Sequence, residues 1–433
     1  MGFAQDVPYE EDYHVFTDAP RLLLTKQRLR LLQRERERQS MRWLQFYTFI
    51  TGGVTMPEQG LDWALYSQVA KNPASGHKAI EWAVDDKHTD PRQLALIFDW
   101  CSSLMTKAQA DRVAAKLEKS LAAGPSGDIA KQNGRALAAI ALAERLPDQG
   151  EAVLKGIVQQ WWRAGLAKNP QKIPREQVYL LYEMMHAIRD NLKIDLRESA
   201  FEYFKTMPTD HLVGHYPSPF EAAENEFRVP VYVRDGEPDL TEAVFSRAAE
   251  LAMVAYDSNA ADSQYLQGWL MQDRFLMRGV LGIIYEFMWA NPYQPGLSYF
   301  QMPLVYHDAI SGHVFARSSW DEDATWIGFF GGHLQLFRNG RIESLRPGAT
   351  ISPIHIGDAV LMSGHDPEWK FQADGEALFV LGLTPKTSYD VEVDNEELAE
   401  AETDSGGTLV IALPPGTDGS EPNLGARIRK RIK

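Results

Sequence analysis

The stretch Ala290-Asn291-Pro292-Tyr293 separates two parts of the sequence that follow different residue patterns. Before it, apolar residues recur at helical spacing, as in RLLLTKQRLRLLQRERERQ (21–39), where we expect Thr25 to cap a helix. After it come short aromatic and β-branched segments that alternate in polarity, such as ATWIGFF (324–330) and HLQLFRNG (333–340). The sequence therefore predicts a helical region followed by a strand region.

The helical part is expected to be a series of short-linked amphipathic helices, whose connections carry Pro or Gly, as in NPASG (72–76). A bundle, a solenoid or a closed toroid would fit, although no fixed-period repeat supports an open solenoid. Beyond the first helix, the predicted helices lie near 40–52, 61–70, 91–105, 107–122, 129–146, 150–166, 175–191, 196–206, 240–257 and 264–289. Further strands are predicted within 313–320, 358–364, 377–383, 389–394 and 408–414.

The chain is long enough for more than one hydrophobic core, since 433 residues exceed the usual size of a single core. We predict an α+β protein of two domains, a helical domain over residues 1–300 and an antiparallel β domain, most simply a sandwich, over residues 301–433. Within the helical part, residues 216–240 are expected to form a loop-rich excursion.

Charge and composition exclude several classes of function. The net charge of −15 disfavours nucleic acid and anionic membranes as partners, because both require a surplus of Lys and Arg. No apolar stretch is long enough to span a bilayer. The single cysteine, Cys101, excludes an internal disulfide and fits a small core residue. The basic end RIRKRIK (427–433) is interpreted as a solvated chain end.

The first residues bear on location. Gly2-Phe3-Ala4 followed by Gln5 resembles the small-residue end of a secretory signal. This pattern favours an exported protein, periplasmic or secreted, over a plain cytoplasmic start.

One predicted helix carries a stripe of groups that could move protons. It begins at Pro174, and Glu176, Tyr179, Tyr182, Glu183 and His186 then recur at spacings of three and four residues. Such a stripe supplies general acids and bases if it faces a cleft. The alternative is an ordinary amphipathic helix with half-buried tyrosines.

Other polar residues are weaker candidates, because the chain has no Walker loop, dinucleotide fingerprint, HExxH pair or nucleophile elbow. Asn133 precedes a helix rich in small residues and could be only a cap. The segment 210–216 contains two histidines and is followed by Glu221, Glu224, Asn225 and Arg228, without a recognised metal-ligand spacing. We expect no cofactor, and a divalent metal stays an open alternative without a ligand motif.

Several segments together resemble the heparinase II/III-like polysaccharide lyases. In the helical part these are APRLLLT (19–25), FDWCSSLMTKAQADRV (98–113), Asn133 with its helix, and the helix over 176–182. In the β part they are SGHVFARS (311–318), TWIGFF and GGHLQLFRNG. The resemblance implies an (α/α) toroid-like domain followed by a β-sandwich, and an activity that degrades acidic glycans by β-elimination.

The resemblance also implies roles for individual residues. Asn133 would neutralise the uronate carboxylate, and Tyr179 or Tyr182 would act as acid and base, with Glu176 or His186 in support. The expected substrate contacts are Arg135, Arg175, His215, Tyr216, Arg228 and His333.

The sequence also departs from that family. The family usually has a His-rich stretch where this chain has only Gly331-Gly332 before His333, and Gly348 stands in RPGAT where an Asp-Ser-Gly-like ending is more typical. The first hypothesis is therefore a lyase acting on an acidic polysaccharide or oligosaccharide, and the alternative is a non-catalytic glycan-binding or structural relative. A glycoside hydrolase would instead need two facing carboxylates. The sequence does not indicate an oligomeric state.

Overall fold

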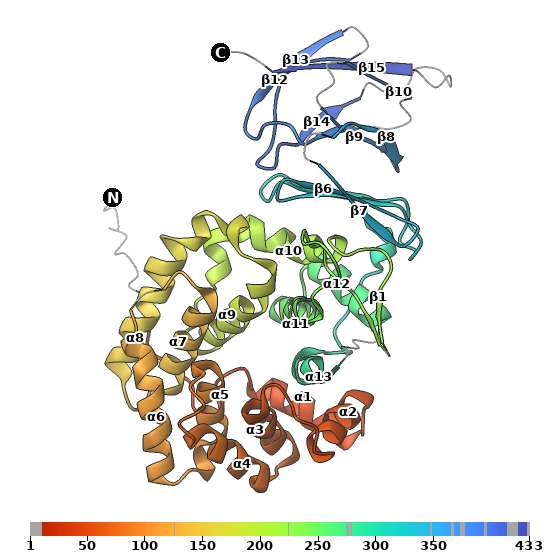
Figure 1. Ribbon diagram of the computed structural model, residues 1–433. Helices are drawn as coiled ribbons and strands as arrows, with labels where there is room; N and C mark the ends of the chain where they lie inside the picture. Colours follow the sequence, from red (N-terminus) through yellow and green to blue (C-terminus); the bar gives the residue numbers. More distant parts are fainter. Residues whose placement is uncertain are drawn as a thin grey trace, which may run out of the picture. The chain divides into compact units, whose positions relative to one another are not determined.

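The computed structural model confirms the predicted order of helices followed by sheets (Figure 1). It describes residues 11–124, 126–223, 225–273, 277, 279–346, 349–364, 368–372, 377–393, 396–413 and 423–430. Within these ranges, no helix is long and apolar enough to cross a membrane. The predictions for Gly2–Gln5, Glu224, Gly348 and the last three residues lie outside the described residues.

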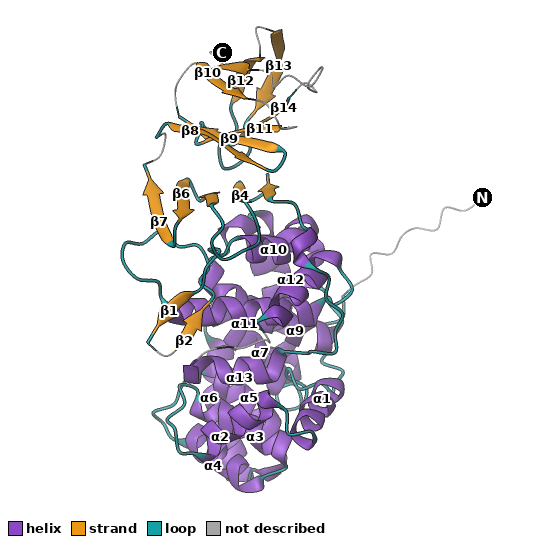
Figure 2. Cartoon of the chain, turned by 90° about the vertical axis from the view of Figure 1, so that its right-hand side faces the viewer, coloured by secondary structure: helices purple, strands orange, loops and turns teal. Residues whose placement is uncertain are grey.

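Helices fill most of the chain before the boundary (Figure 2). They are α1 (Lys26–Glu37), α2 (Met41–Thr51), α3 (Gln59–Ala70), α4 (Pro73–Val84), α5 (Pro91–Cys101), α6 (Lys107–Ala122), α7 (Ile129–Ala141), α8 (Pro147–Lys155), α9 (Val178–Leu192), α10 (Phe201–Val213), α11 (Leu240–Tyr256), α12 (Ala261–Gln272) and α13 (Gly279–Trp289). A π-helical stretch, Gly156–Arg163, continues α8.

Most predicted helices are confirmed, and three predictions need correction. Residues 72–76, predicted as a connection, begin α4, because the Asn72 side chain accepts a hydrogen bond from the Ser75 amide and Pro73 occupies the first turn. The single helix predicted over 264–289 is two helices, α12 and α13. The helix predicted over 196–206 is a 3₁₀ segment, Leu196–Ala200, that leads into α10.

Contacts divide the chain into two compact units. The helical unit comprises Met1–Phe201, Val244–Asp257 and Phe275–Tyr293, and the strand unit comprises Glu202–Ala243, Ser258–Arg274 and Gln294–Lys433. The change from helix to strand falls between α13 and the first strand of the sheets, at Val305. Because helical segments before residue 300 belong to the strand unit, a single cut at residue 300 stays a prediction.

The helical unit is a two-layered ring. Helix α3 packs on α5, α5 on α7 and α7 on α9, while α4, α6 and α8 form a second row outside them (Figure 1). The ring returns through α13, which packs on α2, and α2 packs on α3. The rings of Tyr285 in α13 and Tyr179 in α9 lie 4.8 Å apart, which joins the two ends of the inner row. This arrangement is toroid-like.

The strand unit holds three sheets besides the short hairpin of β1 (Phe220–Ala222) and β2 (Asn225–Phe227) (Figure 2). The first sheet has the order β3-β4-β5-β6-β7, the second β14-β11-β9-β8 and the third β10-β15-β12-β13. The strands are β3 (Val305–Asp308), β4 (His313–Arg317), β5 (Trp326–Phe330), β6 (His333–Arg338), β7 (Arg341–Leu345), β8 (Ile351–Ile356), β9 (Ala359–Ser363), β10 (Glu368–Gln372), β11 (Ala377–Leu381), β12 (Ser388–Val393), β13 (Glu396–Glu402), β14 (Leu409–Ala412) and β15 (Asn423–Lys430).

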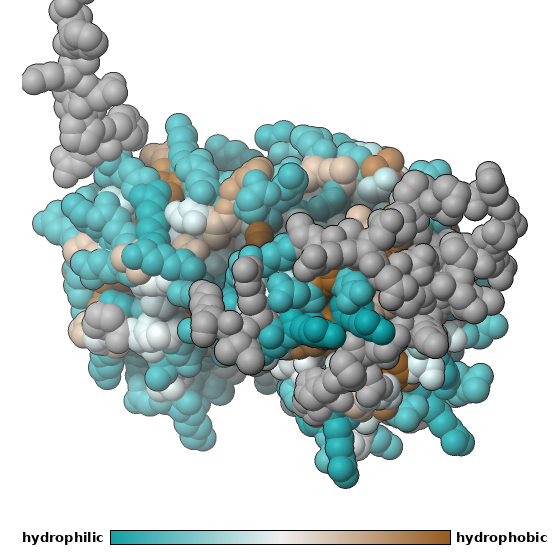
Figure 3. All heavy atoms as spheres, turned by 90° about the horizontal axis from the view of Figure 1, so that it is seen from above, coloured by the Kyte–Doolittle hydropathy of each residue, from teal (hydrophilic) through white to brown (hydrophobic). Residues whose placement is uncertain are grey.

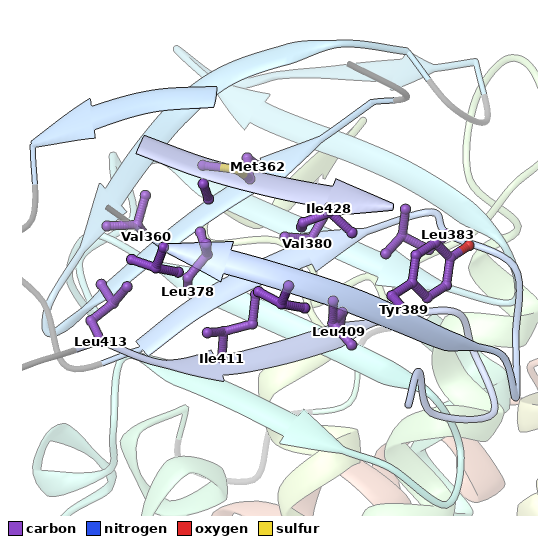
Figure 4. Close-up of a cluster of buried hydrophobic side chains, with 13 residues drawn as sticks. Val360, Met362, Leu378, Val380, Leu383, Tyr389, Leu409, Ile411, Leu413 and Ile428 are labelled. Atoms are coloured by element: carbon purple, nitrogen blue, oxygen red, sulfur yellow. The ribbon is translucent and has the colours of Figure 1, made fainter. Parts of the chain in front are cut away.

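The second sheet is the middle layer of the three. Leu361 of β9 packs in one core with residues of the first sheet, whereas its neighbour Val360 packs in another core with residues of the third. Figure 4 shows this latter core, with Val360, Leu378 and Ile428 among its side chains. Successive side chains of a strand point to opposite faces, so a strand covered on both sides reads as the continuous apolar run seen in DAVLMSG.

The sheets differ from the predictions in two details. Among the described strands, the ladders are antiparallel except for the pair β9–β11, which is parallel. The basic segment at residues 427–430, predicted as a solvated end, belongs to β15, which pairs with β10 on one side and β12 on the other. The backbone ladder accounts for this placement, because its hydrogen bonds do not depend on side-chain polarity.

Candidate functional site

A buried ion cluster lies on the inner row of the helical ring. Arg92 of α5 donates two hydrogen bonds to Glu183 of α9, from Nε to Oε2 at 2.6 Å and from Nη2 to Oε1 at 2.8 Å. Its Nη1 donates to Oε1 of Glu58, just before α3, at 2.5 Å. The Glu183 side chain is 0% exposed, that of Arg92 8% and that of Glu58 16%, so the cluster approaches solvent at Glu58.

Two of the predicted catalytic residues join this cluster. The Asn133 amide Nδ2 donates to Oε2 of Glu183 at 2.7 Å, and the Tyr179 hydroxyl donates to Oε1 at 3.1 Å. Tyr179 in turn accepts a hydrogen bond from the indole of Trp289 at 3.2 Å. The Glu183 carboxylate is therefore held by a guanidinium, an amide and a phenol at once.

Local sequence explains how these groups meet. Arg92 lies in the first turn of α5, where Asp90 caps the helix and Pro91 sets its first position. A Cβ atom at Gly134 would lie 2.7 Å from Cγ of Pro91, so a glycine beside Asn133 allows α7 to approach the start of α5 closely. Tyr179 and Glu183 are four residues apart and share one face of α9.

Burial and neighbouring charges shift the pKa values of Tyr179, Tyr285 and Arg92. Burial raises the pKa of Tyr179 well above its ordinary value, and the neighbouring Glu183 raises it further. The hydroxyl of Tyr285 donates to Glu58. Burial raises the pKa of Tyr285 well above its ordinary value, and the charge of Glu58 raises it further. Burial alone would lower the pKa of Arg92, but Glu183 and Glu58 raise it well above the usual range. Tyr179 is thus a neutral phenol that can donate a hydrogen bond.

Asp62 is a buried carboxyl group on α3 whose two oxygens have no hydrogen-bond partner. Burial raises its pKa well above the ordinary value, and the charge of Glu58 adds to this, although Arg92 opposes it. The pKa of this carboxyl is higher in the folded than in the unfolded protein, so the folded state is favoured when Asp62 is protonated. Stability is therefore lost as the pH rises from the unfolded-state pKa through the folded-state pKa.

Asp62→Asn is therefore expected to stabilise the protein at pH 8 and to change little at pH 4. The amide has the same shape as the acid and cannot ionise. Melting temperatures measured across this pH range check it, with Asp86→Asn as control, since the Asp86 side chain is 81% exposed. A parallel fall in stability for wild type and Asp62→Asn from pH 4 to 8 would show that Asp62 ionises freely.

The other predicted catalytic residues lie outside the cluster. Tyr182 is buried and meets Tyr256 edge to face, with ring centroids 5.8 Å apart. His186 is buried beside Trp289. Glu176 is exposed in a 3₁₀ turn, Arg175–Gln177, that precedes α9. Their proposed catalytic roles stay predictions.

The predicted substrate contacts fall in both units. In the helical unit, Arg135 donates to Gln132 and Arg175 donates to Ser246. In the strand unit, the remaining residues form local contacts or are exposed: His215 bonds the carbonyl of His211, Tyr216 donates to Gln335, Arg228 pairs with Asp273 and Glu322, and His333 is exposed.

The alternative of a divalent metal near residues 210–228 gains no support from the described residues. Residues 210–213 belong to α10 rather than to a loop. Among the described residues, no group of three or more His, Cys, Asp or Glu side chains is arranged to hold a metal ion.

The sequence interpretation missed Arg92, Glu58 and Tyr285, and did not assign a role to Glu183. An arginine directly after a helix-starting proline, in an otherwise apolar helix, was the available signal for Arg92. Glu58 and Tyr285 gave no local signal, because they reach the cluster from segments more than two hundred residues apart.

Comparisons with known proteins do not identify a family. No family model matches the chain, and no curated protein matches it. A solved structure described as a glycoside hydrolase aligns with a TM-score of 0.31 and 8% identity, over 87% of this chain and 72% of that one. A similarity this low supports no argument about fold or activity. The heparinase II/III-like family therefore stays a resemblance.

Proposed function

We propose that the protein cleaves an acidic, uronate-containing glycan by β-elimination. One observation carries the proposal: the donors of Arg92, Asn133 and Tyr179 converge on the carboxylate of Glu183. A guanidinium, an amide and a phenol form the set of groups that would bind the carboxylate of a uronate and stabilise the charge that develops on it.

The reaction assigns a task to each group. In β-elimination a base removes the proton α to the uronate carboxylate, the bond to the leaving oxygen breaks, and that oxygen gains a proton. Asn133 and Arg92 would neutralise the carboxylate, the carboxylate of Glu58 would accept the α proton, and Tyr179 would give its proton to the leaving oxygen. In the proposal the substrate carboxylate replaces that of Glu183, and it enters from the side of Glu58, the most exposed of the charged residues in the cluster.

A second candidate is a protein that binds an acidic glycan without cleaving it. The observation that favours it is that Asn133, Tyr179 and Glu183 are each 0% exposed and already bonded to one another. A hydrolase is less well supported, since both Glu58 and Glu183 are bound by one guanidinium instead of facing each other across a substrate. Export, which would bring the protein to such glycans, is part of the proposal.

The lyase proposal predicts that Tyr179→Phe loses at least about 100-fold in activity, the range expected for removal of a general acid. Cleavage creates an unsaturated uronide, so the rise in ultraviolet absorbance is measured with heparan sulfate, hyaluronan and alginate. Tyr66→Phe is the matched control, because Tyr66 is a buried tyrosine of the same unit outside the cluster. Full activity in Tyr179→Phe would remove Tyr179 from the mechanism.

The same panel separates the two candidates. Retention on an immobilised acidic glycan without any absorbance change would replace the lyase with the binding protein. Neither retention nor cleavage on any of these glycans would overturn both candidates.

A further inference from the structure

An arginine of α1 presents an unsatisfied nitrogen at the inner row of the helical ring. The guanidinium of Arg28 lies over the ring of Trp289, 3.9 Å from its centroid. Its Nη1 atom is shielded from solvent and has no hydrogen-bond partner. No carboxylate in the described part of the chain forms an ion pair with Arg28. A buried N–H of a charged group without an acceptor is costly, so an acceptor from outside the chain is expected there.

The charges that face Arg28 come from α9. Burial lowers its pKa to about 10, the carboxylate of Asp190 and the hydroxyl of Tyr179 oppose this, and the positive charge of Arg189 adds to it. With a pKa of about 10 the guanidinium stays charged at neutral pH. Asp190 is shared, because Nε of Arg189 also lies 3.5 Å from its Oδ1. The charge of Asp190 therefore acts on both guanidinium groups.

Arg189 opens this region to solvent. Its side chain is 29% exposed and that of Asp190 20%. The guanidinium lies 3.6 Å from the centroid of Tyr256, and its Nη1 donates to the Tyr256 carbonyl at 2.7 Å. A third cation nearby, Arg197, is already paired with Asp195 and Asp257.

The two arginines are linked through His186, whose uncharged ring contacts Arg189 and lies 4.6 Å from the ring of Trp289 that Arg28 covers. Nε2 of His186 lies 3.0 Å from the Ala252 carbonyl and so carries the proton, which leaves Nδ1 to accept from Nη2 of Arg189 at 3.4 Å. Burial lowers the pKa of His186 well below its usual value, and the charges of Arg28 and Arg189 lower it further. The positive charge of this region therefore comes from the two arginines alone.

We propose that Arg28 and Arg189 form a binding site for an oxyanion, the sulfate ester or carboxylate of an acidic glycan. The planar array of donors on a guanidinium matches the oxygens of such groups. The guanidinium of Arg28 stacks on Trp289 and that of Arg189 stacks on Tyr256, which holds both in place. The site adjoins the cluster at Glu183, because the Trp289 ring that Arg28 covers also donates to Tyr179. That the anion belongs to a glycan rests on the proposed function, whereas the oxyanion site itself does not.

The test is calorimetric titration of the full chain with sodium sulfate, against sodium chloride at equal ionic strength. Wild type is expected to bind sulfate and Arg28→Met to bind it at least about 10-fold more weakly, since methionine keeps an apolar stem over Trp289 and removes the donors. Arg30→Met, an exposed arginine of the same helix, is the control and should bind as wild type does. If Arg28→Met does not fold, Arg189→Gln serves in its place.

Each outcome of these titrations supports or overturns the oxyanion site. No sulfate binding by wild type, or equal binding by wild type and Arg28→Met, overturns the site. A second titration uses a heparin disaccharide and its desulfated form, which identifies the bound group as sulfate or carboxylate. Sulfate binding that depends on Arg28, without binding of either disaccharide, keeps the oxyanion site and counts against the glycan proposal. Glycan cleavage without any sulfate binding supports the proposed function and overturns the oxyanion site.

Discussion

Replacing Glu183 with glutamine is expected to lower the free energy of unfolding by about 3 kcal/mol, the low end of the usual cost of removing one partner of a buried ion pair, because Arg92 keeps its ion pair with Glu58. Arg92 would lose the bidentate acceptor of its Nε and Nη2, and Asn133 and Tyr179 would lose a charged acceptor. Urea unfolding at pH 7 measures the change through the transition midpoint.

The control for this prediction is Glu176→Gln, which makes the same chemical change at an exposed position just before α9. Its effect should stay within about 0.5 kcal/mol. A double variant, Arg92→Met with Glu183→Leu, should recover much of the loss, because it removes both buried charges instead of one. Equal stability of Glu183→Gln and Glu176→Gln would mean that the cluster does not stabilise the ring.

Much of the fold could be predicted because its signals are local. Thr25 caps α1 by accepting from the amide of Arg28, and residues 107–122 form a helix over the predicted span. The errors also have physical reasons. Asn72-Pro73 starts a helix as readily as it ends one, so NPASG could not be assigned from composition alone. The basic residues of β15 hid a strand whose backbone is paired on both sides.

Less of the candidate site could be predicted, because its members are joined by tertiary contacts. Helical spacing placed Tyr179 and Glu183 on one face, and the resemblance singled out Asn133, and these three do meet. Spacing could not show that Arg92 would join them, since that contact crosses 91 residues of sequence. Nor could it show that Tyr179, Tyr182 and His186 are buried, because a side chain facing a cleft and one facing the core have the same periodicity.

The ring and the sheets place their polar groups differently. In the helical unit, Arg92, Glu183 and Glu58 pair with one another in the interior, whereas two core clusters of the strand unit are apolar. The molecular surface is largely hydrophilic in the view from above, with only small hydrophobic areas (Figure 3). An interior of paired charges contributes less to stability than an apolar core, so we expect the inner row of the ring to be retained for binding or chemistry.

The stability of the strand unit should depend most on its middle sheet. Leu361→Ala is expected to cost about 2–5 kcal/mol, because it removes a fully buried side chain between two sheets and leaves a cavity. Val410→Ala in β14 of the same sheet is the control, since Val410 is 41% exposed and little surface is lost there. Native-state hydrogen exchange of the amides in β9 and β11 measures the effect without assuming that the whole chain unfolds in one step. Equal protection in the two variants would contradict the three-layer packing, because Leu361 would then not be enclosed between sheets.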